Sequence, residues 1–408
     1  MITHYLDELV ASANKILLLQ GPIGPFFFQF GEWLSHEQGK TVYKINFNAG
    51  DDHFYPPSSP NTFQFSDHFV ILRAYLKQFC REHCIDAMVC FGDNRHCHKI
   101  AKRVAEELNI PFWAFEEGYF RPNYVTLEKS GVNAYSPIPR ESAFFLELAH
   151  ELHESPQPLH VAKGFYPMAK LATQYYVATY LAHKRYSHYK HHRILSLRYY
   201  IKLWVTSGIK RLCYLLKDSS FAKDVENGKF GQFFIVPLQV YDDSQISEHT
   251  DYESVEAFLR DVLISFANYA PPHINLIVKH HPMDRGFIDY SHVIEEIEQD
   301  YSNLKGRVFY IHDVPLPVFL RHGQGMVTLN STSGVSALLH GMPVKTLGRA
   351  NYDIPGLTSQ CSLEEFWNNP QIPDANLFIA YRRYHLNKTQ INGNFYNRVI
   401  LRCPYNQS

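Results

Sequence analysis

Two stretches of the sequence place cationic or hydroxyl side chains directly after apolar runs. Residues 277–287, IVKHHPMDRGF, end such a run at Lys279, His280, His281 and Pro282. Residues 326–348, MVTLNSTSGVSALLHGMPVKTLG, end another at Ser331, Thr332, Ser333 and Gly334, before a helical pattern resumes. Ligands of open parallel sheets bind beyond the carboxyl ends of the strands, and free N–H groups at a helix start attract anions. The two stretches are therefore predicted to face one anionic ligand, and a phosphate fits between them.

Each stretch also has an interpretation that needs no such ligand. Serine and threonine are common helix N-caps, and KHHP can be a polar loop after a strand. His280, His281 and Asp284 are residue types that bind metals, but adjacent histidines at a strand end point to opposite sides. We therefore expect no metal and no cofactor. The absence of GxGxxG and GxxxxGK[ST] patterns argues against a dinucleotide site or a P-loop.

Acidic side chains follow an apolar run in the first half of the chain. In FEEGYFRP, residues 115–122, the adjacent carboxylates Glu116 and Glu117 precede Arg121. Adjacent carboxylates repel, so one is expected to have a raised pKa while the other stays an anion, which suits nucleophilic or acid/base catalysis. Structural pairing of either glutamate with Arg121 is the alternative. FGDNRHCH, residues 91–98, presents in the same way Asp93, Arg95 and His98.

Strand and helix patterns alternate around both sets of residues. Apolar runs at 16–19, 88–91 and 112–115 alternate with helical patterns, and five further runs follow: QFFIVPLQ, INLIVKHHP, RVFYIH, GMVTLNS and MPVKTLG. This alternation predicts an α/β protein with parallel sheets covered on both faces. A chain of 408 residues is longer than one hydrophobic core usually supports, so we expect two doubly wound domains facing a cleft. The expected divisions are domains at 1–155 and 229–370, a helical segment at 156–228 and a helical tail at 371–408.

The middle segment is strongly basic. No acidic residue lies between Glu154 and Asp218, while eleven Lys and Arg do, which leaves the rest of the chain at −12 within a net charge of −1. Cations interleaved with aromatic residues are typical of surfaces that meet lipid headgroups or nucleic acid, and a solvated basic face is the alternative. If the segment meets a membrane, tyrosines such as Tyr175 and Tyr176 are expected at headgroup depth. The cations expected to face the membrane are Lys184, Arg185, Lys190 and Arg193.

The N-terminal stretch MITHYLDELVASANK carries acids where a signal peptide carries cations, and no stretch approaches the roughly 20 apolar residues of a membrane span. Seven scattered cysteines suit a reducing compartment. These features predict a cytoplasmic protein.

Several motifs in order along the chain resemble the capsule polysaccharide synthesis family of the KpsS/LipB type. They are LLLQGPIGPFF, FGDNRHCHKIA, EEGYFRPNYVTLE, VPLQVYDDSQI, VKHHP and NSTSGVSALLHGMPVKTLG. The resemblance implies a GT-B arrangement of two Rossmann-like domains. It also implies a retaining transferase that moves β-Kdo from CMP-Kdo to a phosphatidylglycerol-type lipid, at the inner face of the inner membrane and without a metal. Other capsule synthesis and export proteins are expected partners, and nucleic acid is not.

The resemblance also implies roles for individual residues. Lys279, His281 and the neighbouring Pro282 would meet the CMP phosphate, with Ser331, Thr332, Ser333 and Gly334 on its other side and Gln239 near the nucleotide. Glu117 matches the family's acidic position and would be the nucleophile, although the related pattern has Asp there, so Glu116 stays a candidate. The positions expected to contact the acceptor or the sugar are Gly21, Asp93, Arg95 and Arg121.

Two other functions fit the same sequence. A GT-B transferase or epimerase acting on a UDP-sugar would need groups for a second phosphate, such as a second cluster of amides or an arginine near the helix start. Arg349 is the arginine found downstream of the serine-rich turn. A non-catalytic adaptor could recruit a lipid-linked glycan to an exporter through the basic segment, but it would not need to keep Glu117, His281 and Ser333 together.

Overall fold

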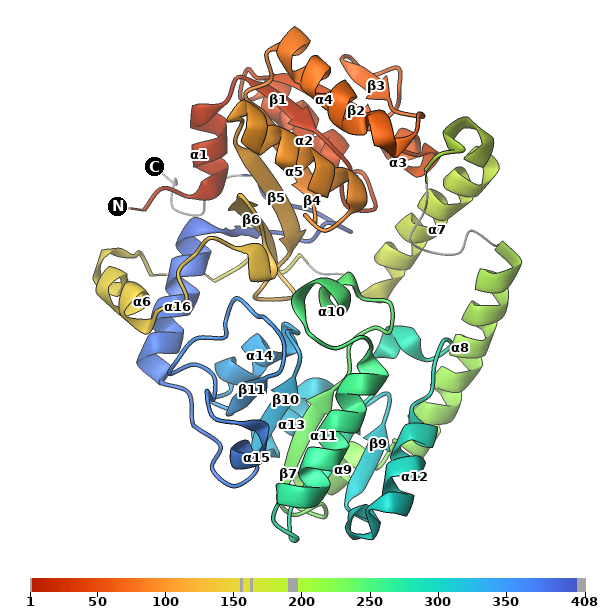
Figure 1. Cartoon of the computed structure of the whole chain (residues 1–408), viewed down its shortest axis with the longest axis vertical. Coiled ribbons are helices and arrows are strands. Elements are labelled where there is room, and N and C mark those ends of the chain that lie inside the picture. The colour runs from red at the N-terminus through yellow and green to blue at the C-terminus, as the bar shows by residue number, and fades with distance from the viewer. Residues whose placement is uncertain (1, 155–156, 162–163, 190–196, 402–408) are drawn as a thin grey trace. The chain divides into compact units, whose positions relative to one another are not determined.

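A computed structural model describes residues 2–154, 157–161, 164–189 and 197–401 (Figure 1). The chain divides into two compact units. The first contains residues 1–138, 148–197 and 382–408, and the second contains residues 139–147 and 198–381. The segment predicted at 156–228 is thus divided between the units, and α16 (Ala375–Lys388) begins in the second and ends in the first.

The first unit contains a seven-stranded sheet in the order β12-β6-β5-β4-β1-β2-β3. Its strands β1 to β5 are parallel, whereas β6 is antiparallel to β5 and β12 is antiparallel to β6. The strands are β1 (Lys15–Leu18), β2 (Thr41–Asn46), β3 (Thr62–Gln64), β4 (Ala87–Phe91), β5 (Phe112–Glu117), β6 (Tyr124–Lys129) and β12 (Gln390–Asn392). The parallel strands confirm the predicted βα alternation, while β12 comes from the tail and was not expected.

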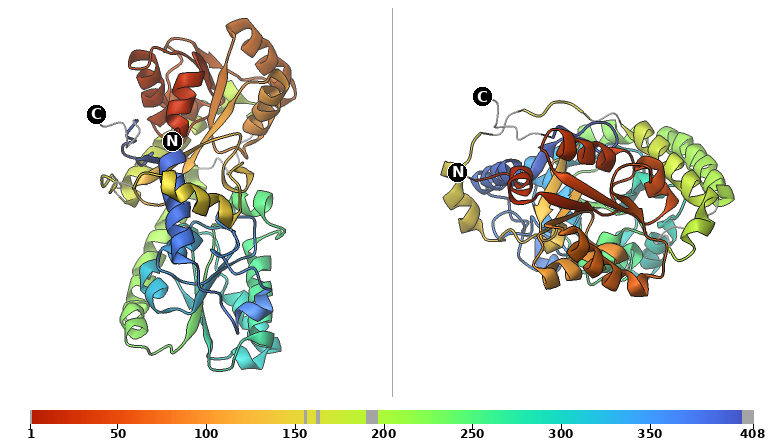
Figure 2. Two further views of the ribbon diagram at one scale, coloured as in Figure 1. Left: turned by 90° about the vertical axis from the view of Figure 1, so that its left-hand side faces the viewer. Right: turned by 90° about the horizontal axis from the view of Figure 1, so that it is seen from above.

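Each face of this sheet has its own core. Leu18 and Phe115 pack with helices α1 and α2, whereas Leu17 and Ala114 pack with α4 and α5. Figure 2 shows these two pairs of helices on opposite sides of the strands. Because both faces are buried, the central strands β1, β4 and β5 are largely apolar, and for this reason they could be recognised in the sequence. The helices and short 3₁₀ turns of this unit are α1 (Tyr5–Ser12), α2 (Phe26–His36), α3 (Ala49–Phe54), α4 (Phe69–His83), α5 (His96–Leu108), η1 (Asn133–Tyr135), η2 (Ala149–Glu151), α7 (Phe165–Leu181) and η3 (His183–Tyr186).

The second unit contains a five-stranded, fully parallel sheet in the order β11-β10-β7-β8-β9. Its strands are β7 (Phe233–Pro237), β8 (Asn275–Lys279), β9 (Val308–Ile311), β10 (Gly325–Thr328) and β11 (Val344–Thr346). These are the five apolar runs read from the sequence, so the doubly wound prediction is confirmed.

The remaining helices belong to the second unit or link it to the first. They are α6 (Ser142–Leu148), α8 (Leu197–Lys217), α9 (Phe221–Glu226), α10 (Ser244–His249), α11 (Val255–Tyr269), η4 (Pro282–Asp284), α12 (Ser291–Asp300), η5 (Ser302–Leu304), α13 (Leu316–His322), α14 (Ser333–Leu339) and α15 (Leu363–Phe366). Among the described residues, no helix is both long enough and apolar enough to cross a membrane.

Candidate functional site

Strand β8 ends in the two predicted histidines, and the structure separates them. His280 is buried, and its Nδ1 lies 2.6 Å from the hydroxyl of Tyr310. Burial lowers the pKa of His280 to about 3, so its ring is neutral. His281 is partly exposed, and its Nδ1 accepts a hydrogen bond from the Met283 N–H (3.2 Å). Because Nδ1 accepts this bond, a neutral His281 ring carries its proton on Nε2. The Nε2–H group can then donate a hydrogen bond to an anion.

Lys279, the last residue of β8, is buried, with 8% of its surface exposed. Burial lowers the pKa of its ammonium to about 8, although the nearby Asp313 acts in the opposite direction. Its Nζ lies 3.4 Å from the carbonyl oxygen of His312, at the end of the neighbouring strand β9. The lysine is thus a cation held at the carboxyl edge with little water around it.

Gln239 and Asn330 connect two other strand ends of this sheet. Gln239 follows β7 and Asn330 follows β10. The Gln239 amide donates to Asn330 Oδ1 (3.1 Å), and the Asn330 N–H donates to Gln239 Oε1 (3.4 Å). Because β7 lies between β10 and β8, Gln239 sits between the serine-rich turn and the histidines along one edge. Asn330 was not singled out from the sequence.

Hydrogen bonds inside the serine-rich turn and a contact with Tyr352 fix its conformation. The Ser331 hydroxyl accepts from the Ser333 N–H (3.2 Å) and donates to the Ser333 hydroxyl (3.1 Å). Thr332 occupies the N-cap position of α14 without a side-chain cap bond, so local capping by Ser331 explains part of this motif. Tyr352 donates to the Ser331 carbonyl (2.5 Å), and its ring leaves no room for a side chain at Gly334. The glycine therefore lets the turn lie directly on Tyr352.

A further cluster at the end of β9 was not foreseen. His312 is buried and stacks on Tyr214 of α8 with ring centroids 3.7 Å apart. The Asp218 carboxylate accepts from the backbone N–H groups of His312 (3.0 Å) and Asp313 (3.2 Å). Burial lowers the pKa of His312 to about 4. These contacts hold the end of β9 to the end of α8. Asp218 could not be identified from the sequence, because its partners lie far along the chain.

In the first unit, Glu116 and Glu117 occupy opposite faces of strand β5. Glu116 Oε2 accepts from the Asn133 side chain (3.2 Å), whereas Glu117 Oε1 accepts from the Tyr396 hydroxyl (3.0 Å). Burial raises the pKa of Glu116 to about 7, and the nearby Glu117 and Asp93 add to the shift. The expectation that one of the two carboxyls has a raised pKa therefore agrees with the structure for Glu116.

Asp93 and Glu116 are held by the same loop. Asp93 is buried and accepts from the Val132 N–H (3.2 Å), next to the Asn133 that binds Glu116. Burial raises the pKa of Asp93. Loop 131–133 thus places two acids side by side at the carboxyl ends of β4 and β5.

Arg121 is exposed and lies beside the glutamates. Its Nε donates to the Gly118 carbonyl (3.4 Å), and within the described residues no ion pair joins it to Glu116 or Glu117. Gly118 lies against the backbone of Tyr124, where any side chain would collide. Structural pairing with Arg121 therefore does not account for the two glutamates.

The remaining predicted residues of this edge form a second group. Arg95 Nη1 donates to the carbonyl of Gly21 (3.2 Å), and His98 is buried with Nδ1 bonded to the Gly92 carbonyl. Gln20, which precedes Gly21, donates to Asp51 Oδ2 (3.1 Å) and to the hydroxyl of Tyr175 (3.2 Å). Gln20, Asp51 and Tyr175 were not identified as site residues in the sequence.

The described part of the basic segment corrects one expectation and refines another. Tyr175 was expected at headgroup depth, but it is 7% exposed and packs against Gly50, with its hydroxyl bound by Asn48 Nδ2 (2.7 Å). Arg185 lies 3.6 Å from Asp52, so this cation has an intramolecular partner, whereas Lys184 lines a pocket. Lys190 and Arg193 lie outside the described residues.

The carboxyl edges of the two sheets therefore differ in their chemistry. The first unit presents acids at the ends of β4 and β5, and the second presents cations, amides and hydroxyls at the ends of β8, β7 and β10. Among the described residues, no group of three or more His, Cys, Asp or Glu is arranged to hold a metal ion. Asp284, one of the residues considered as a ligand, instead accepts from the Tyr241 N–H (2.8 Å).

The two doubly wound units, each with polar groups at the carboxyl edge of its sheet, define a GT-B-like α/β protein. Residues 86–396 match the family model described as capsule polysaccharide biosynthesis protein, and the chain belongs to that family. The resemblance read from its motifs is confirmed.

Named relatives agree with this assignment. The chain is 56% identical over 404 residues to the capsule polysaccharide modification protein LipB of Neisseria meningitidis serogroup B, covering 98% of this chain and 96% of LipB. It is 39% identical over 395 residues to the capsule polysaccharide export protein KpsS of Escherichia coli, covering 95% of this chain and 98% of KpsS. Among solved structures, Thermosulfurimonas dismutans KpsC, a beta Kdo 2,7 transferase, matches 89% of this chain and 88% of its own with 13% identity and a TM-score of 0.40. That similarity is too low to carry a conclusion about function.

Proposed function

We propose that this protein is a retaining glycosyltransferase that moves β-Kdo from CMP-Kdo to a phosphatidylglycerol-type lipid and so starts a capsule linker. The observation that carries the proposal is the contrast between Glu116 and Glu117. Glu116 has a pKa of about 7, while Glu117, on the other face of the same strand, is oriented by Tyr396. Two carboxyls in different environments are what a double displacement with separate nucleophile and acid/base roles requires.

In the proposed first step, a Glu117 oxygen attacks the anomeric carbon of Kdo and the bond from that carbon to the CMP phosphate oxygen breaks. The electron pair stays with the phosphate, whose charge is stabilised by Lys279, His281 and the hydroxyl of Ser333. In the second step, an acceptor hydroxyl attacks the glycosyl–enzyme bond and releases the Glu117 carboxylate. The acceptor proton passes to Glu116, whose pKa near neutrality suits both directions of proton transfer.

A UDP-sugar is a weaker candidate donor because of where Arg349 lies. Its guanidinium donates to Asp251 Oδ1 (2.8 Å) and to the carbonyl of Thr250 (3.3 Å). Arg349 is therefore already engaged, and a second phosphate would have to displace these bonds.

The face of α8 supports peripheral binding to an anionic membrane. Its side chains at i, i+4, i+7 and i+11 form one apolar stripe with exposures of 58, 59, 65 and 78%: Val205, Ile209, Leu212 and Leu216. Arg211 and Lys217 are exposed on the same helix. An apolar stripe flanked by cations is the pattern of helices that lie in an anionic lipid interface.

The transferase proposal is tested by mass spectrometry of a fluorescent phosphatidylglycerol analogue incubated with the enzyme and CMP-Kdo. The expected product is the analogue carrying one Kdo, formed by the wild type and not by Glu117→Gln. A product with UDP-sugars and none with CMP-Kdo would replace the proposed donor. Membrane binding without transfer from either donor would favour the adaptor alternative.

Membrane association is tested separately by vesicle flotation. We expect binding to vesicles that contain phosphatidylglycerol, weaker at high salt, and little binding to phosphatidylcholine vesicles. A Leu212→Ser, Leu216→Ser double variant should lose binding and keep CMP affinity, since these side chains are 65 and 78% exposed and contribute little to the core. Undiminished flotation of this variant would exclude α8 as the docking element.

A further inference from the structure

The loop that follows strand β6 has an uncommon backbone conformation. Ser130, Gly131 and Asn133 have φ angles of 70°, 152° and 56°, in a region that residues with side chains rarely adopt. Val132, between them, is fully buried in the core that the sheet forms with α4 and α5. Strained backbone of this kind persists only where the surrounding structure holds it, and it is common at functional sites. Because Val132 anchors the loop, the direction in which the neighbouring Asn133 points is fixed as well.

Asn133 makes two hydrogen bonds at the acidic edge of the first sheet, which consists of Asp93, Glu116 and Glu117. Its backbone N–H donates to the hydroxyl of Tyr119 (3.0 Å), a side chain with 2% of its surface exposed. Its side-chain amide donates to Glu116 Oε2 (3.2 Å), while the Glu117 N–H donates to Glu116 Oε1 (2.9 Å). Both oxygens of the Glu116 carboxyl therefore have a donor, and the one from Asn133 belongs to an anchored loop.

The carboxyl that Asn133 contacts has other acids nearby. Burial is the main cause of the raised pKa of Glu116, and the charges of Glu117 and Asp93 add to it. The register of β5 and β6 places the buried Glu128 of β6 on the same side of the sheet as Glu116. Like charges in such a space oppose ionisation of Glu116, whereas a hydrogen bond donated to its carboxylate favours it. The amide of Asn133 supplies such a bond without adding a charge.

Other elements around Glu116 also bring groups that titrate or carry charge. These groups are Cys90 of β4, Arg121 after β5, Tyr396 of the C-terminal tail, and Lys99 and Lys102 of α5, which act on Asp93. Arg121 favours the charged form of Glu116, but it is exposed and donates to the Gly118 carbonyl. In the part of the chain that the structure describes, the side chain hydrogen bonded to the Glu116 carboxyl is that of Asn133.

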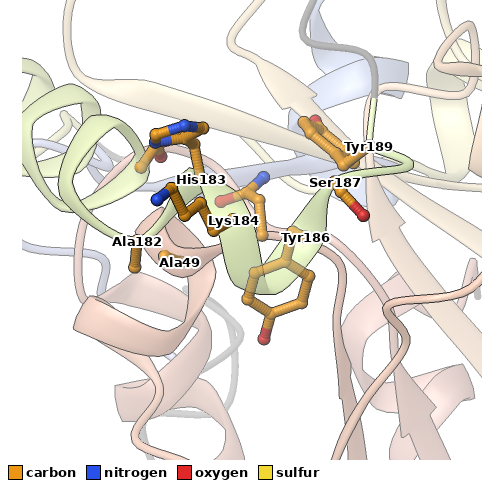
Figure 3. Close-up of a pocket in the computed structure, with 9 residues that line it drawn as sticks. Ala49, Ala182, His183, Lys184, Tyr186, Ser187 and Tyr189 are labelled. Atoms are coloured by element: carbon orange, nitrogen blue, oxygen red, sulfur yellow. The ribbon is translucent and has the colours of Figure 1, made fainter.

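The loop lies apart from a pocket of about 360 Å³ in the same unit. Residues of α3, the end of α7 and the turn after it line that pocket, among them Lys184, Tyr186 and Tyr189 (Figure 3). Helix α3 follows β2, whereas loop 130–133 follows β6, and β5, β4 and β1 lie between these two strands in the sheet. A substitution at Asn133 is therefore local to the acidic edge and leaves the pocket intact.

We propose that Asn133 is a positioning residue for the acid/base group, whose amide holds the Glu116 carboxyl in the orientation that receives the acceptor proton. The left-handed backbone of loop 130–133 presents this amide, and the Tyr119 hydroxyl fixes that backbone. The amide favours the ionised carboxylate, which is the form that accepts a proton. The catalytic role rests on the proposed function, whereas the effect of the amide on the ionisation of Glu116 follows from the contact alone.

Two substitutions separate the amide from the backbone that carries it. Asn133→Gly removes the amide and keeps the loop unstrained, because glycine adopts a φ of 56° without steric cost. Asn133→Ala removes the same amide and adds backbone strain, so it should be the less stable of the two. Asn109→Gly is the matched control, because Asn109 has a φ of 53° and follows α5 near the amino end of β5, opposite the acidic edge.

The first measurement is a carboxyl NMR titration of the full chain with isotopically labelled glutamate, in which the Glu116 signal is assigned by its loss in Glu116→Gln. Both Asn133 variants should raise the titration midpoint of Glu116 by about one pH unit, because one hydrogen bond to a carboxylate changes its ionisation constant about tenfold. Asn109→Gly should keep the wild-type midpoint. The second measurement is the pH profile of Kdo transfer, whose rise with pH should shift by the same amount with KM for CMP-Kdo unchanged. A thermal melt of each variant reports its stability.

Each result decides the proposal. An unchanged Glu116 midpoint in both Asn133 variants overturns it. A loss of transfer that follows stability, large in Asn133→Ala and absent in Asn133→Gly, also overturns it, because the loop would then have a structural role alone. A shifted midpoint with an unchanged pH profile of transfer would reject the positioning role and leave the proposed function intact. A shifted midpoint in a protein whose wild type transfers no Kdo would support the effect of the amide on Glu116 and reject the transferase.

Discussion

The carboxyl edges of the two sheets have the same architecture and opposite chemistry. In the first unit, Asp93 follows β4 and Glu116 and Glu117 end β5, whereas in the second unit Lys279 ends β8 and His281 comes shortly after it. Both sheets have apolar central strands, so the difference resides in the few residues at the carboxyl ends of the strands and directly after them. A doubly wound unit thus acts as a neutral scaffold, and the few residues at the strand ends determine whether its edge presents cations or acids.

One physical cause acts in opposite directions at the two edges. Burial raises the pKa of Glu116 to about 7 and lowers the pKa of Lys279 to about 8. In both cases desolvation disfavours the charged form, so an acid and a base move toward neutrality from opposite sides. Each edge therefore contains one group whose charge changes in the pH range where enzymes operate.

The largest effect is expected from Glu117→Gln, which keeps the shape of the side chain and removes the proposed nucleophile. Transfer should fall by about a thousandfold or more, as in enzymes that lose a covalent nucleophile. CMP affinity should stay within twofold of the wild type, because the proposed role of the acidic edge is at the sugar and not at the nucleotide. The measurement is kcat for Kdo transfer together with CMP binding by calorimetry.

Glu116→Gln is the matched control for that variant. It should reduce transfer less than Glu117→Gln and flatten the pH profile near 7, because Glu116 is the group with a pKa there. An inactive Glu116→Gln beside a fully active Glu117→Gln would assign the nucleophile to Glu116 and reverse the two roles.

At the basic edge, His281→Ala and Ser333→Ala should each reduce turnover about a hundredfold, close to 3 kcal/mol of transition-state stabilisation. Both should also weaken CMP binding, which distinguishes them from Glu117→Gln. His273→Ala serves as the control, because His273 is an exposed histidine of the same unit. Wild-type rates in both variants would remove the basic edge from the mechanism.

The features predicted from the sequence were those with a local signal. Continuous apolar runs identified β7 to β11, and the hydroxyl-rich stretch after β10 marked the start of α14 at Ser333. The adjacent histidines were expected to diverge, and His280 is indeed buried while His281 reaches the surface. Strand periodicity and turn composition suffice for such features, because they depend on neighbours in sequence.

The missed features depend on partners far along the chain. Tyr396 reaches Glu117 across 279 positions, and β12 joins the sheet by pairing with β6. Tyr175 was misplaced because aromatic residues among cations are typical of membrane surfaces. In the structure, its ring fits against Gly50, where a Cβ would lie 2.6 Å from it. No local pattern distinguishes a tyrosine that meets lipid from one that fills the space above a distant glycine.

Lys279 makes the basic edge sensitive to pH. Below about pH 8 its ammonium is charged and available to a phosphate, and above that value the free protein loses the proton. CMP affinity should therefore fall as pH rises, by about 30-fold between pH 7 and pH 9.5 if the complex keeps its proton throughout that range. Calorimetry of CMP binding across this range measures the effect. Lys279→Gln should bind weakly with a flat profile, and an unchanged slope in that variant would assign the titration to another group.

Tyr396→Phe is expected to have the smallest effect and to test how the acidic edge is oriented. The phenol hydroxyl lies 3.0 Å from Glu117 Oε1, and its removal deletes one hydrogen bond to a carboxylate, worth about 1.5 kcal/mol or roughly tenfold in rate. We expect kcat to fall by that factor, with KM for the donor and CMP affinity unchanged, because the residue acts through Glu117. Tyr384→Phe is the control, since Tyr384 is a buried tyrosine of the same C-terminal part of the chain. Combining Tyr396→Phe with Glu117→Gln separates orientation from packing: if the tyrosine acts only by holding Glu117, the double variant should be no slower than Glu117→Gln alone. A further tenfold loss in the double variant would instead mean that Tyr396 supports the edge independently of the carboxylate.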